Sequence, residues 1–341
     1  MAINGTGTGS STISTQFQQV FVKKMLDHAV QLLCLDQFGQ KVPFPRNAGA
    51  LTMTFMRPDV ADPLMKSNPT GGTSVQIQSS ANEGQPLTVF RAQTYTYVTA
   101  TMAQFMEGIK LTDVLTWTQL YDAMETGTTT MGEDVALYAD STIRNELVGA
   151  VTGTGNRRYV GLTQTFAGLS ALSTSAGTLT IQDLLDGMTQ ATIQRAPKLD
   201  GEYVCVAGAQ VGRDILSDPK VVLAGQYGTS KALLNGEIGR WYGVRVVQCT
   251  NPFIEASGGT EGTYSTAGVN IYRTFVLGKG AYGIPILAGG SPFSPRIMIC
   301  RDPDKADPAN NFVTATVKGY WTVKTLNAVW AVSISSKSTF A

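Results

Sequence analysis

Two strand-like runs flank a long polar segment early in the chain, and this arrangement constrains the fold more than any other feature. In the first run, GALTMTFMRP, Leu51, Met53 and Phe55 alternate with threonines, and Pro58 ends the pattern. The second run, PLTVFRAQTYTYVTATMAQF, alternates in the same way around Tyr97. Alternation with a period of two residues is typical of strands. The two runs therefore predict a long antiparallel hairpin.

The segment between the runs, DVADPLMKSNPTGGTSVQIQSSANEGQ, is rich in Pro, Gly, Ser and Asn. Structureless loops longer than about 15 residues are uncommon in compact domains and are usually functional. The hairpin also has little hydrophobic sequence to pack over it, and an isolated two-stranded hairpin is only marginally stable in water. We therefore expect the hairpin, with residues 62–85 at its tip, to dock on another body.

A helical pattern follows over Thr112–Val151, with apolar residues at three- and four-residue steps. Arg144 and Glu146 are expected to point outward from it. The stretch TGTTTMG, Thr126–Gly132, is poor helix sequence and predicts a kink or an interruption. An uninterrupted helix of about 40 residues would span roughly 60 Å. Such a helix beside a long hairpin indicates an extended subunit rather than a globule.

The rest of the chain predicts a compact lobe and then a return. Helices and strands alternate here as in an α/β lobe. They are a helix over Ile181–Gln194, the buried strand GEYVCVAG, the helix AQVGRDILSD and the strands in GEIGRWYGVRVVQCT and NIYRTFVLGKGAYGIPIL. The chain returns through RIMICRD to the closing strands in NFVTATVKGYWTVKTLNAVWAVSIS, which are broken near Lys324–Asn327. The N-terminal arm predicts one short helix within Thr15–Phe38.

The composition indicates a surface that meets other protein. Only 15% of the 341 residues are charged, against roughly a quarter in ordinary soluble domains. A poorly charged surface is typical of interfaces. The net charge of +1 argues against a protein whose main work is to neutralise phosphates. No apolar run approaches the roughly 18 residues of a membrane span, and the start MAINGTGTGSSTIST predicts a flexible arm rather than a secretory signal.

Residues that carry metal or thiol chemistry are sparse. The chain has a single histidine, His28, which nearly excludes histidine-based catalysis and multi-histidine metal sites. The four cysteines, Cys34, Cys205, Cys249 and Cys300, form no CxxC pair, so we expect buried reduced thiols, which would suit a reducing cytoplasm.

Three stretches only partly match known phosphate-binding or calcium-binding motifs. GTGTGSS near the start lacks the strand, the third glycine and the lysine of a phosphate loop, and LGKGAYG around Lys279 is expected to be a strand that ends in a turn. The cluster Asp302, Asp304 and Asp307 lacks the glycine and glutamate of a calcium loop, which favours a surface turn. We therefore predict no catalytic, cofactor-binding or metal-binding residues, no cofactor, and a protein that is not an enzyme.

Five phrases and the order of the elements resemble a known family. The phrases are EDVALYADSTIRNEL, GEYVCVAGAQVGRDIL, LNGEIGRWYGVRVV, FVLGKGAYG and VKGYWTVKTLNAVWAVSI. Together they cover less than a third of the chain, whereas the element order covers nearly all of it. The chain resembles the major capsid proteins of tailed bacteriophages, in particular the family of phage N-four. That resemblance implies an α+β chain with the HK-ninety-seven-like capsid fold.

The resemblance also implies a division of the chain. It assigns residues 1–42 to an N-terminal arm and 43–104 to an extended hairpin, the E-loop, which lies across a neighbouring subunit. It assigns 105–180 to a peripheral domain with a long spine helix and 181–290 to an axial domain. Residues 291–341 would be return strands that complete the peripheral sheet beside the spine helix, with Trp321 and Trp330 in that sheet.

The implied function is a viral major capsid protein. It would self-assemble into the pentamers and hexamers of an icosahedral shell around double-stranded DNA, in the virion, after assembly in the host cytoplasm. Its partners would be itself, portal and scaffolding proteins and decoration proteins, with weak non-specific contact with the genome and no membrane. Two alternatives stay open: an encapsulin-type nanocompartment shell protein, and an α/β enzyme with an unrecognised motif.

Overall fold

The computed structural model describes residues 33–44, 52–58, 95–118, 122–152, 155–161, 163–221, 239–287, 296–300 and 311–340. Most of the predicted N-terminal arm lies outside these ranges, and of the helix expected within Thr15–Phe38 only the short 3₁₀ helix η1 (Leu35–Phe38) is described. The expected hairpin tip, residues 62–85, also lies outside them.

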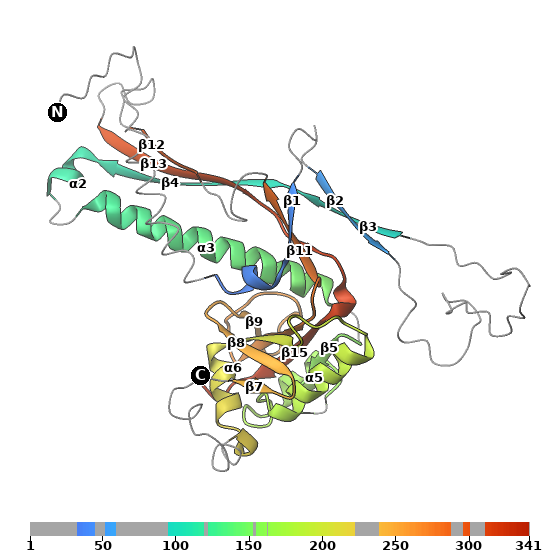
Figure 1. Ribbon diagram of the computed structural model, residues 1–341. Helices are drawn as coiled ribbons and strands as arrows, with labels where there is room; N and C mark the ends of the chain where they lie inside the picture. The colour runs from blue at the N-terminus through green and yellow to red at the C-terminus, as the bar shows by residue number, and fades with distance from the viewer. Residues whose placement is uncertain are drawn as a thin grey trace, which may run out of the picture.

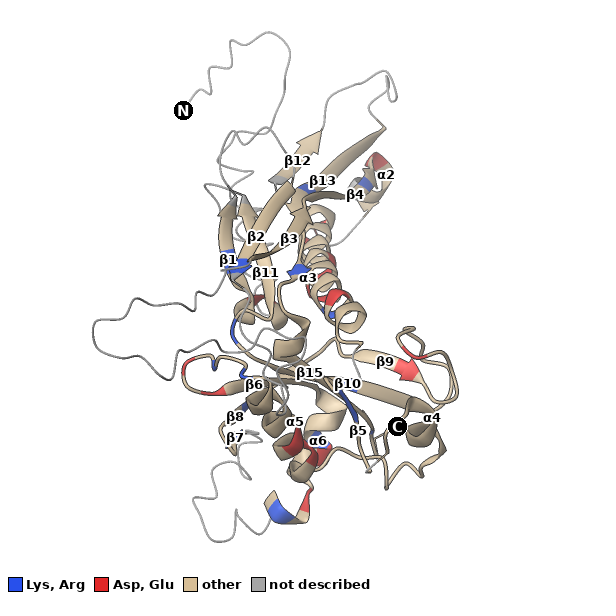
Figure 2. Cartoon of the chain, turned by 90° about the vertical axis from the view of Figure 1, so that its right-hand side faces the viewer, with Lys and Arg blue, Asp and Glu red and all other residues tan. Residues whose placement is uncertain are grey.

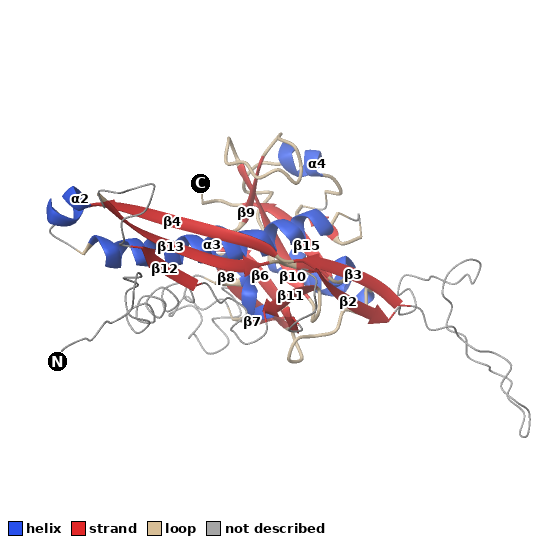
Figure 3. Cartoon of the chain, turned by 90° about the horizontal axis from the view of Figure 1, so that it is seen from above, coloured by secondary structure: helices blue, strands red, loops and turns tan. Residues whose placement is uncertain are grey.

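A long helix and a long three-stranded sheet run side by side through one half of the molecule (Figure 1). The strands β4 (Ala103–Thr112) and β12 (Arg296–Cys300) pair antiparallel with β13 (Phe312–Trp321) between them. Helix α2 (Asp113–Thr118) follows β4, and α3 (Ala123–Ala150) lies against the sheet. Seen from above, this half of the molecule is long and narrow (Figure 3).

Helix α3 runs without interruption through Thr126–Gly132, so the predicted kink is wrong. The hydroxyls of Thr128, Thr129 and Thr130 each donate to the carbonyl four residues earlier, at 2.7, 3.0 and 3.2 Å, so they are satisfied inside the helix. Met131 is fully buried, and packing of that kind outweighs weak intrinsic propensity. The helix begins instead at Asp122, whose carboxylate accepts from the backbone N–H of Met124 at 2.9 Å.

The second half is a lobe built on a seven-stranded sheet in the order β5-β15-β10-β6-β8-β7, with β9 paired to β10. Its helix α5 begins at a capping box in which Thr180 and Asp183 bond each other's backbone N–H groups. The elements are β5 (Arg157–Tyr159), α4 (Phe166–Ala171), α5 (Ile181–Ile193), β6 (Tyr203–Gly208), α6 (Ala209–Leu216), β7 (Arg240–Trp241), β8 (Val244–Cys249), β9 (Phe253–Ala256), β10 (Asn270–Leu277) and β15 (Ala331–Lys337).

Two cores cover the two faces of the lobe sheet. Helices α5 and α6 cover one face, where Leu184 and Ile215 share a core with Ile334 of β15. The opposite face contributes Phe275 to a larger core that also contains Ile143 of α3 and Trp321 of β13. Helix α3 therefore joins the lobe to the three-stranded sheet.

The closing strands do not stay in one sheet, which corrects the expectation for 291–341. Strand β13 lies beside the long helix as predicted, and the break after it contains β14 (Lys324–Thr325) and the 3₁₀ helix η2 (Ala328–Trp330). Strand β15, however, inserts between β10 and β5 in the lobe. Trp330 accordingly lies in η2, half-buried, and not in the sheet. All seven residues of β15 are buried, which explains its run of small and β-branched residues.

The predicted hairpin is present as the antiparallel pair β2 (Thr52–Pro58) and β3 (Tyr95–Thr101). Beside it, β1 (Gln40–Phe44) runs parallel to β11 (Tyr282–Leu287), which in turn pairs with β14. The hairpin projects from the end of the molecule away from α2 (Figures 1 and 3).

Candidate assembly interface

On one face of the β2–β3 hairpin, every residue whose burial the structure describes is exposed and uncharged. The side chains alternate so that one set turns to solvent and the other to the body of the molecule. Within the exposed set, Tyr97 is 64% exposed, and its cross-strand partner Met56 is 61% exposed. We call this set the hairpin face; it consists of Thr52, Thr54, Met56, Tyr95, Tyr97, Thr99 and Thr101.

The opposite face of the hairpin fixes it to the body. Phe55 is buried against Gly283 of β11, where an added Cβ would lie only 2.9 Å from the phenyl ring. A glycine is therefore needed at this close approach. Arg57, the only charged residue in the described part of the hairpin, turns inward and donates to the Leu326 carbonyl at 3.1 Å. The hairpin face thus carries no charge at all.

The edges of the hairpin are open as well. Over the described residues, β2 and β3 pair only with each other, and β12 and β4 are the two edges of the three-stranded sheet. An unpaired edge offers main-chain donors and acceptors to a strand of another chain. Most of the ribbon of β2, β3, β4 and β12 in Figure 2 has the colour of uncharged residues, and the charged residues of these strands are Arg57, Glu107, Lys110 and Arg296. Charge is one of the devices that normally blocks such pairing.

A buried aspartate holds the N-terminal segment where it enters the body. Asp140 of α3 accepts from the backbone N–H of Cys34 at 3.0 Å and from that of Leu35 at 3.1 Å. The Tyr282 hydroxyl donates to the Leu35 carbonyl. Burial raises the pKa of Asp140 to about 6, opposed by these two backbone donors. Arm, helix and β11 therefore meet at one buried polar junction.

Arg144 also faces inward, so its predicted outward orientation is wrong. Its side chain is buried, and its Nη1 donates to Asn251 Oδ1 at 2.5 Å and to the Pro252 carbonyl at 3.2 Å. The guanidinium lies over the ring of Tyr264, 5.2 Å from its centroid. These contacts couple α3 to the segment that precedes β9, through Asn251 and Pro252, and to the loop that follows β9, through Tyr264. Glu146 is partly exposed and pairs with Lys324 at 2.8 Å.

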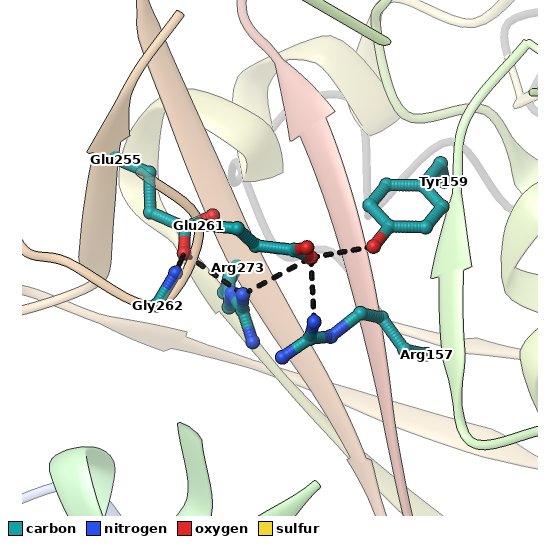
Figure 4. A network of polar contacts seen from close by, with 6 residues as sticks. All are labelled: Arg157, Tyr159, Glu255, Glu261, Gly262 and Arg273. Atoms are coloured by element: carbon teal, nitrogen blue, oxygen red, sulfur yellow. Dashed lines mark hydrogen bonds and ion pairs between the residues drawn. The ribbon is translucent and has the colours of Figure 1, made fainter. Parts of the chain in front are cut away.

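A second polar network holds the loop between β9 and β10 onto the lobe sheet (Figure 4). Glu261 Oε1 accepts from the Tyr159 hydroxyl at 2.5 Å and pairs with Arg157 at 2.7 Å and with Arg273 at 3.5 Å. Arg273 also pairs with Glu255 at 2.8 Å, and both side chains are fully buried. Burial, and then the bond to Glu261, raises the pKa of Tyr159 to about 12. The network is structural: its charges pair with one another.

A carboxyl pair joins β4 to α3. Glu107 of β4 lies near Asp134 of α3, and burial, together with the neighbouring Asp134 carboxyl and its charge, raises the pKa of Glu107 to about 7. The folded chain therefore holds this proton more tightly than the unfolded chain, whose glutamate titrates near its ordinary value of 4.5. The resulting stabilisation is complete below about pH 4.5 and is lost as the pH rises through about 7.

We expect Glu107→Gln to reduce this pH dependence. The unfolding midpoint of the parent chain, measured by thermal denaturation at pH 5.5 and pH 8, should fall by more than that of the variant, because glutamine does not titrate. Asp134→Asn should reduce the dependence in the same direction, since it removes the other half of the pair. An unchanged difference between the two pH values in both variants would show that the pair does not share a proton.

Of the residues singled out in the sequence for chemistry, only Cys34 and Cys249 come near each other in the described part of the chain, on either side of Asp140. His28, the GTGTGSS stretch and the Asp302–Asp307 cluster lie outside the described ranges. Lys279 lies in the predicted turn, where its backbone N–H donates to the Pro197 carbonyl at 2.8 Å. Cys34, Cys205 and Cys249 are buried as expected, whereas Cys300 is exposed. In the described ranges, no group of three His, Cys, Asp or Glu residues could hold a metal ion, and no helix is long and apolar enough to cross a membrane.

Comparison with known proteins finds matches among solved structures. No family model matches the sequence, and no curated protein matches it. Solved structures do match. The capsid of Ralstonia phage GP4 superposes with a TM-score of 0.63 at 13% identity, over 89% of this chain and 87% of that chain. The capsid of cyanophage P-SCSP1u gives 0.62 at 12% identity, over 98% and 91%. A virus-like particle from Pyrococcus furiosus gives 0.51 at 8% identity, over 94% and 100%.

The chain therefore has the α+β fold of phage capsid proteins over nearly its whole length. The fold class expected from the order of the sequence elements is confirmed. At these identities the likeness establishes the fold, and the function is inferred from the hairpin face and the open edges described above.

Proposed function

We propose that this chain is the major capsid protein of a tailed bacteriophage, a structural protein rather than an enzyme. It assembles into pentamers and hexamers of an icosahedral shell that encloses double-stranded DNA. The observation that carries the proposal is the uncharged, exposed hairpin face on a body with the capsid fold. A hairpin that buries only one of its faces within its own chain leaves the other for a neighbouring copy.

The subunit supplies what a shell requires. Rings of identical subunits close through heterologous contacts, and each contact needs to form in slightly different surroundings. Strand addition at the open edges of β2 and β3 uses main-chain hydrogen bonds, which tolerate modest changes in neighbouring side chains. Many such contacts then hold the shell together by multivalency. The rigid α3 and its sheet keep the shape of the subunit constant while the hairpin adapts.

We assign the parts of the chain accordingly. Residues 1–42 form the arm and 43–104 the hairpin that lies across a neighbour. The peripheral domain comprises β4, α2, α3, β12 and β13, and the axial domain is the lobe, to which β15 belongs through its pairing with β10. The net charge of +1 supports only weak, non-specific contact with the genome. Portal, scaffolding and decoration proteins are further partners, and assembly takes place in the host cytoplasm before the chain resides in the virion.

Electron microscopy of the purified full-length chain tests the proposal, with scaffold supplied if required. We expect hollow closed shells. An encapsulin-type shell is the second candidate because the Pyrococcus furiosus particle shares the fold. It differs in its content: shells isolated from infected cells would hold DNA, whereas an encapsulin would hold a protein cargo. Small discrete oligomers under all assembly conditions would contradict both and favour an enzyme.

A further inference from the structure

Two cysteines far apart in the sequence meet where the N-terminal segment enters the body. Cys34 directly precedes η1, and Cys249 ends β8. The Cys34 thiol donates to the carbonyl of Gln248, the residue before Cys249, at 3.4 Å. Both residues are buried, at 7% and 3% exposure. The other two cysteines lie elsewhere, Cys205 within β6 and Cys300 at the end of β12.

Asp140 contacts both cysteines. Its Oδ2 accepts from the backbone N–H of Cys34 at 3.0 Å and lies 4.0 Å from Cys249 Sγ. The backbone N–H of Asn251 donates to the same sulfur at 3.4 Å. One carboxylate oxygen therefore contacts the backbone of Cys34 and the sulfur of Cys249, and the Cys34 thiol reaches the residue before Cys249, so both side chains lie in one small buried site.

The surroundings shift the pKa values of the two thiols in opposite directions. The neighbouring Cys34 thiol, the N–H of Asn251 and the positive charge of Arg144 lower the pKa of Cys249 against the opposing effects of burial and Asp140. The pKa of Cys34 is raised by the neighbouring Cys249 and by burial. Cys249 therefore ionises more readily than Cys34, and it is the better nucleophile because the thiolate is the reactive form.

We propose that Cys34 and Cys249 close into a disulfide when the chain meets a small-molecule disulfide such as oxidised glutathione. The Cys249 thiolate attacks one sulfur of the oxidant and expels one glutathione thiolate. Cys34 then gives its proton to that thiolate and attacks the Cys249 sulfur, which expels the second glutathione as a thiolate; this thiolate takes from solvent the proton that Cys249 released when it ionised. Two protein thiols are oxidised, one glutathione disulfide is reduced to two thiols, and no other reactant is needed.

The bridge would tie the start of the body to the lobe. It closes a loop of about 215 residues, and long loops lose the most unfolded-state entropy when they are cross-linked. A reducing cytosol would keep the pair open and an oxidising medium would close it. Since both thiols are buried, the segment around η1 has to open locally to admit the oxidant. We therefore expect the pair to react more slowly than the exposed Cys300. The inference is independent of the proposed function.

The test is oxidation of the reduced full-length chain with oxidised glutathione, followed by peptide mapping without reducing agent. We expect a linked peptide pair that contains Cys34 and Cys249, and a rise of the unfolding midpoint on the order of 5 °C that dithiothreitol reverses. Cys205→Ser and Cys300→Ser are the matched controls and should still form the bridge. Cys34→Ser and Cys249→Ser should each lose it together with the rise in midpoint.

If a serine variant fails to fold, peptide mapping of the oxidised parent chain still tests the proposal. A bridge from either cysteine to Cys205 or Cys300 would overturn it. So would a stable glutathione adduct at Cys249 without closure, or free thiols at both positions after Cys300 has reacted completely and the oxidant has remained in excess.

Discussion

Truncating Trp321 to alanine is expected to lower the free energy of unfolding by about 3–5 kcal/mol. Trp321 is 1% exposed and ends β13, in the core that α3 shares with both large sheets. Removing its indole leaves a cavity at the place where the two halves of the molecule join. The loss should appear as a lower urea midpoint in equilibrium unfolding of the isolated subunit.

Tyr320→Ala provides the matched control for that prediction. Tyr320 precedes Trp321 on the same strand and is 39% exposed. Neighbouring side chains on a strand point to opposite faces, so the control removes a ring of similar chemistry from the solvent side. Its cost should be below about 1 kcal/mol. Equal losses in the two variants would show that the core at the junction is not where the structure places it.

Replacing Tyr97 with aspartate should abolish shell assembly while leaving the subunit folded. The ring is 64% exposed in the isolated chain and lies opposite Met56 on the hairpin face, so the fold does not depend on it. In the assembled particle we expect the ring to be buried against a neighbouring copy, where an unpaired charge is strongly unfavourable. Central aromatic residues of interfaces typically contribute about 2 kcal/mol or more. Because every subunit repeats the contact, the loss is multiplied across the shell.

Thr52→Asp serves as the comparison for Tyr97→Asp. Thr52 belongs to the same exposed face but lies at its other end, paired with Thr101. Both variants add one charge to one face, so an effect of net charge alone would appear in both. Circular dichroism should show the parent fold in each variant, and the yield of shells in electron microscopy should fall further for Tyr97→Asp than for Thr52→Asp, because only the change at position 97 also removes an aromatic ring. If Tyr97→Asp formed normal shells, the hairpin face would not be part of the assembly interface.

The large pattern of the molecule could be read from the sequence because its signals are local. Period-two alternation around Phe55 and Tyr97 identified the hairpin, and a regular apolar stripe identified the long helix. The helix α5 and the strand β6 were also evident, since an apolar stripe marks the first and a wholly apolar run marks the second. These features depend on neighbouring residues and not on the tertiary arrangement.

What the sequence did not reveal depends on contacts between distant segments. Arg144 looked like a surface residue because its helix position is polar, yet it is buried against Asn251 of the lobe. Asp140 carried no signal at all, although it anchors the N-terminal segment through Cys34. The destination of β15 was likewise hidden, since its residues suit any buried sheet. Its pairing with β10 and β5 depends on the tertiary arrangement of the strands.

Cryo-electron microscopy of the assembled particle tests the central claim most directly. We predict that Met56, Tyr95 and Tyr97 are covered by a neighbouring copy of the chain, and that the lobes gather around the fivefold and sixfold axes. A particle in which this face points into solvent, or a hairpin that folds back over its own lobe, would contradict the claim.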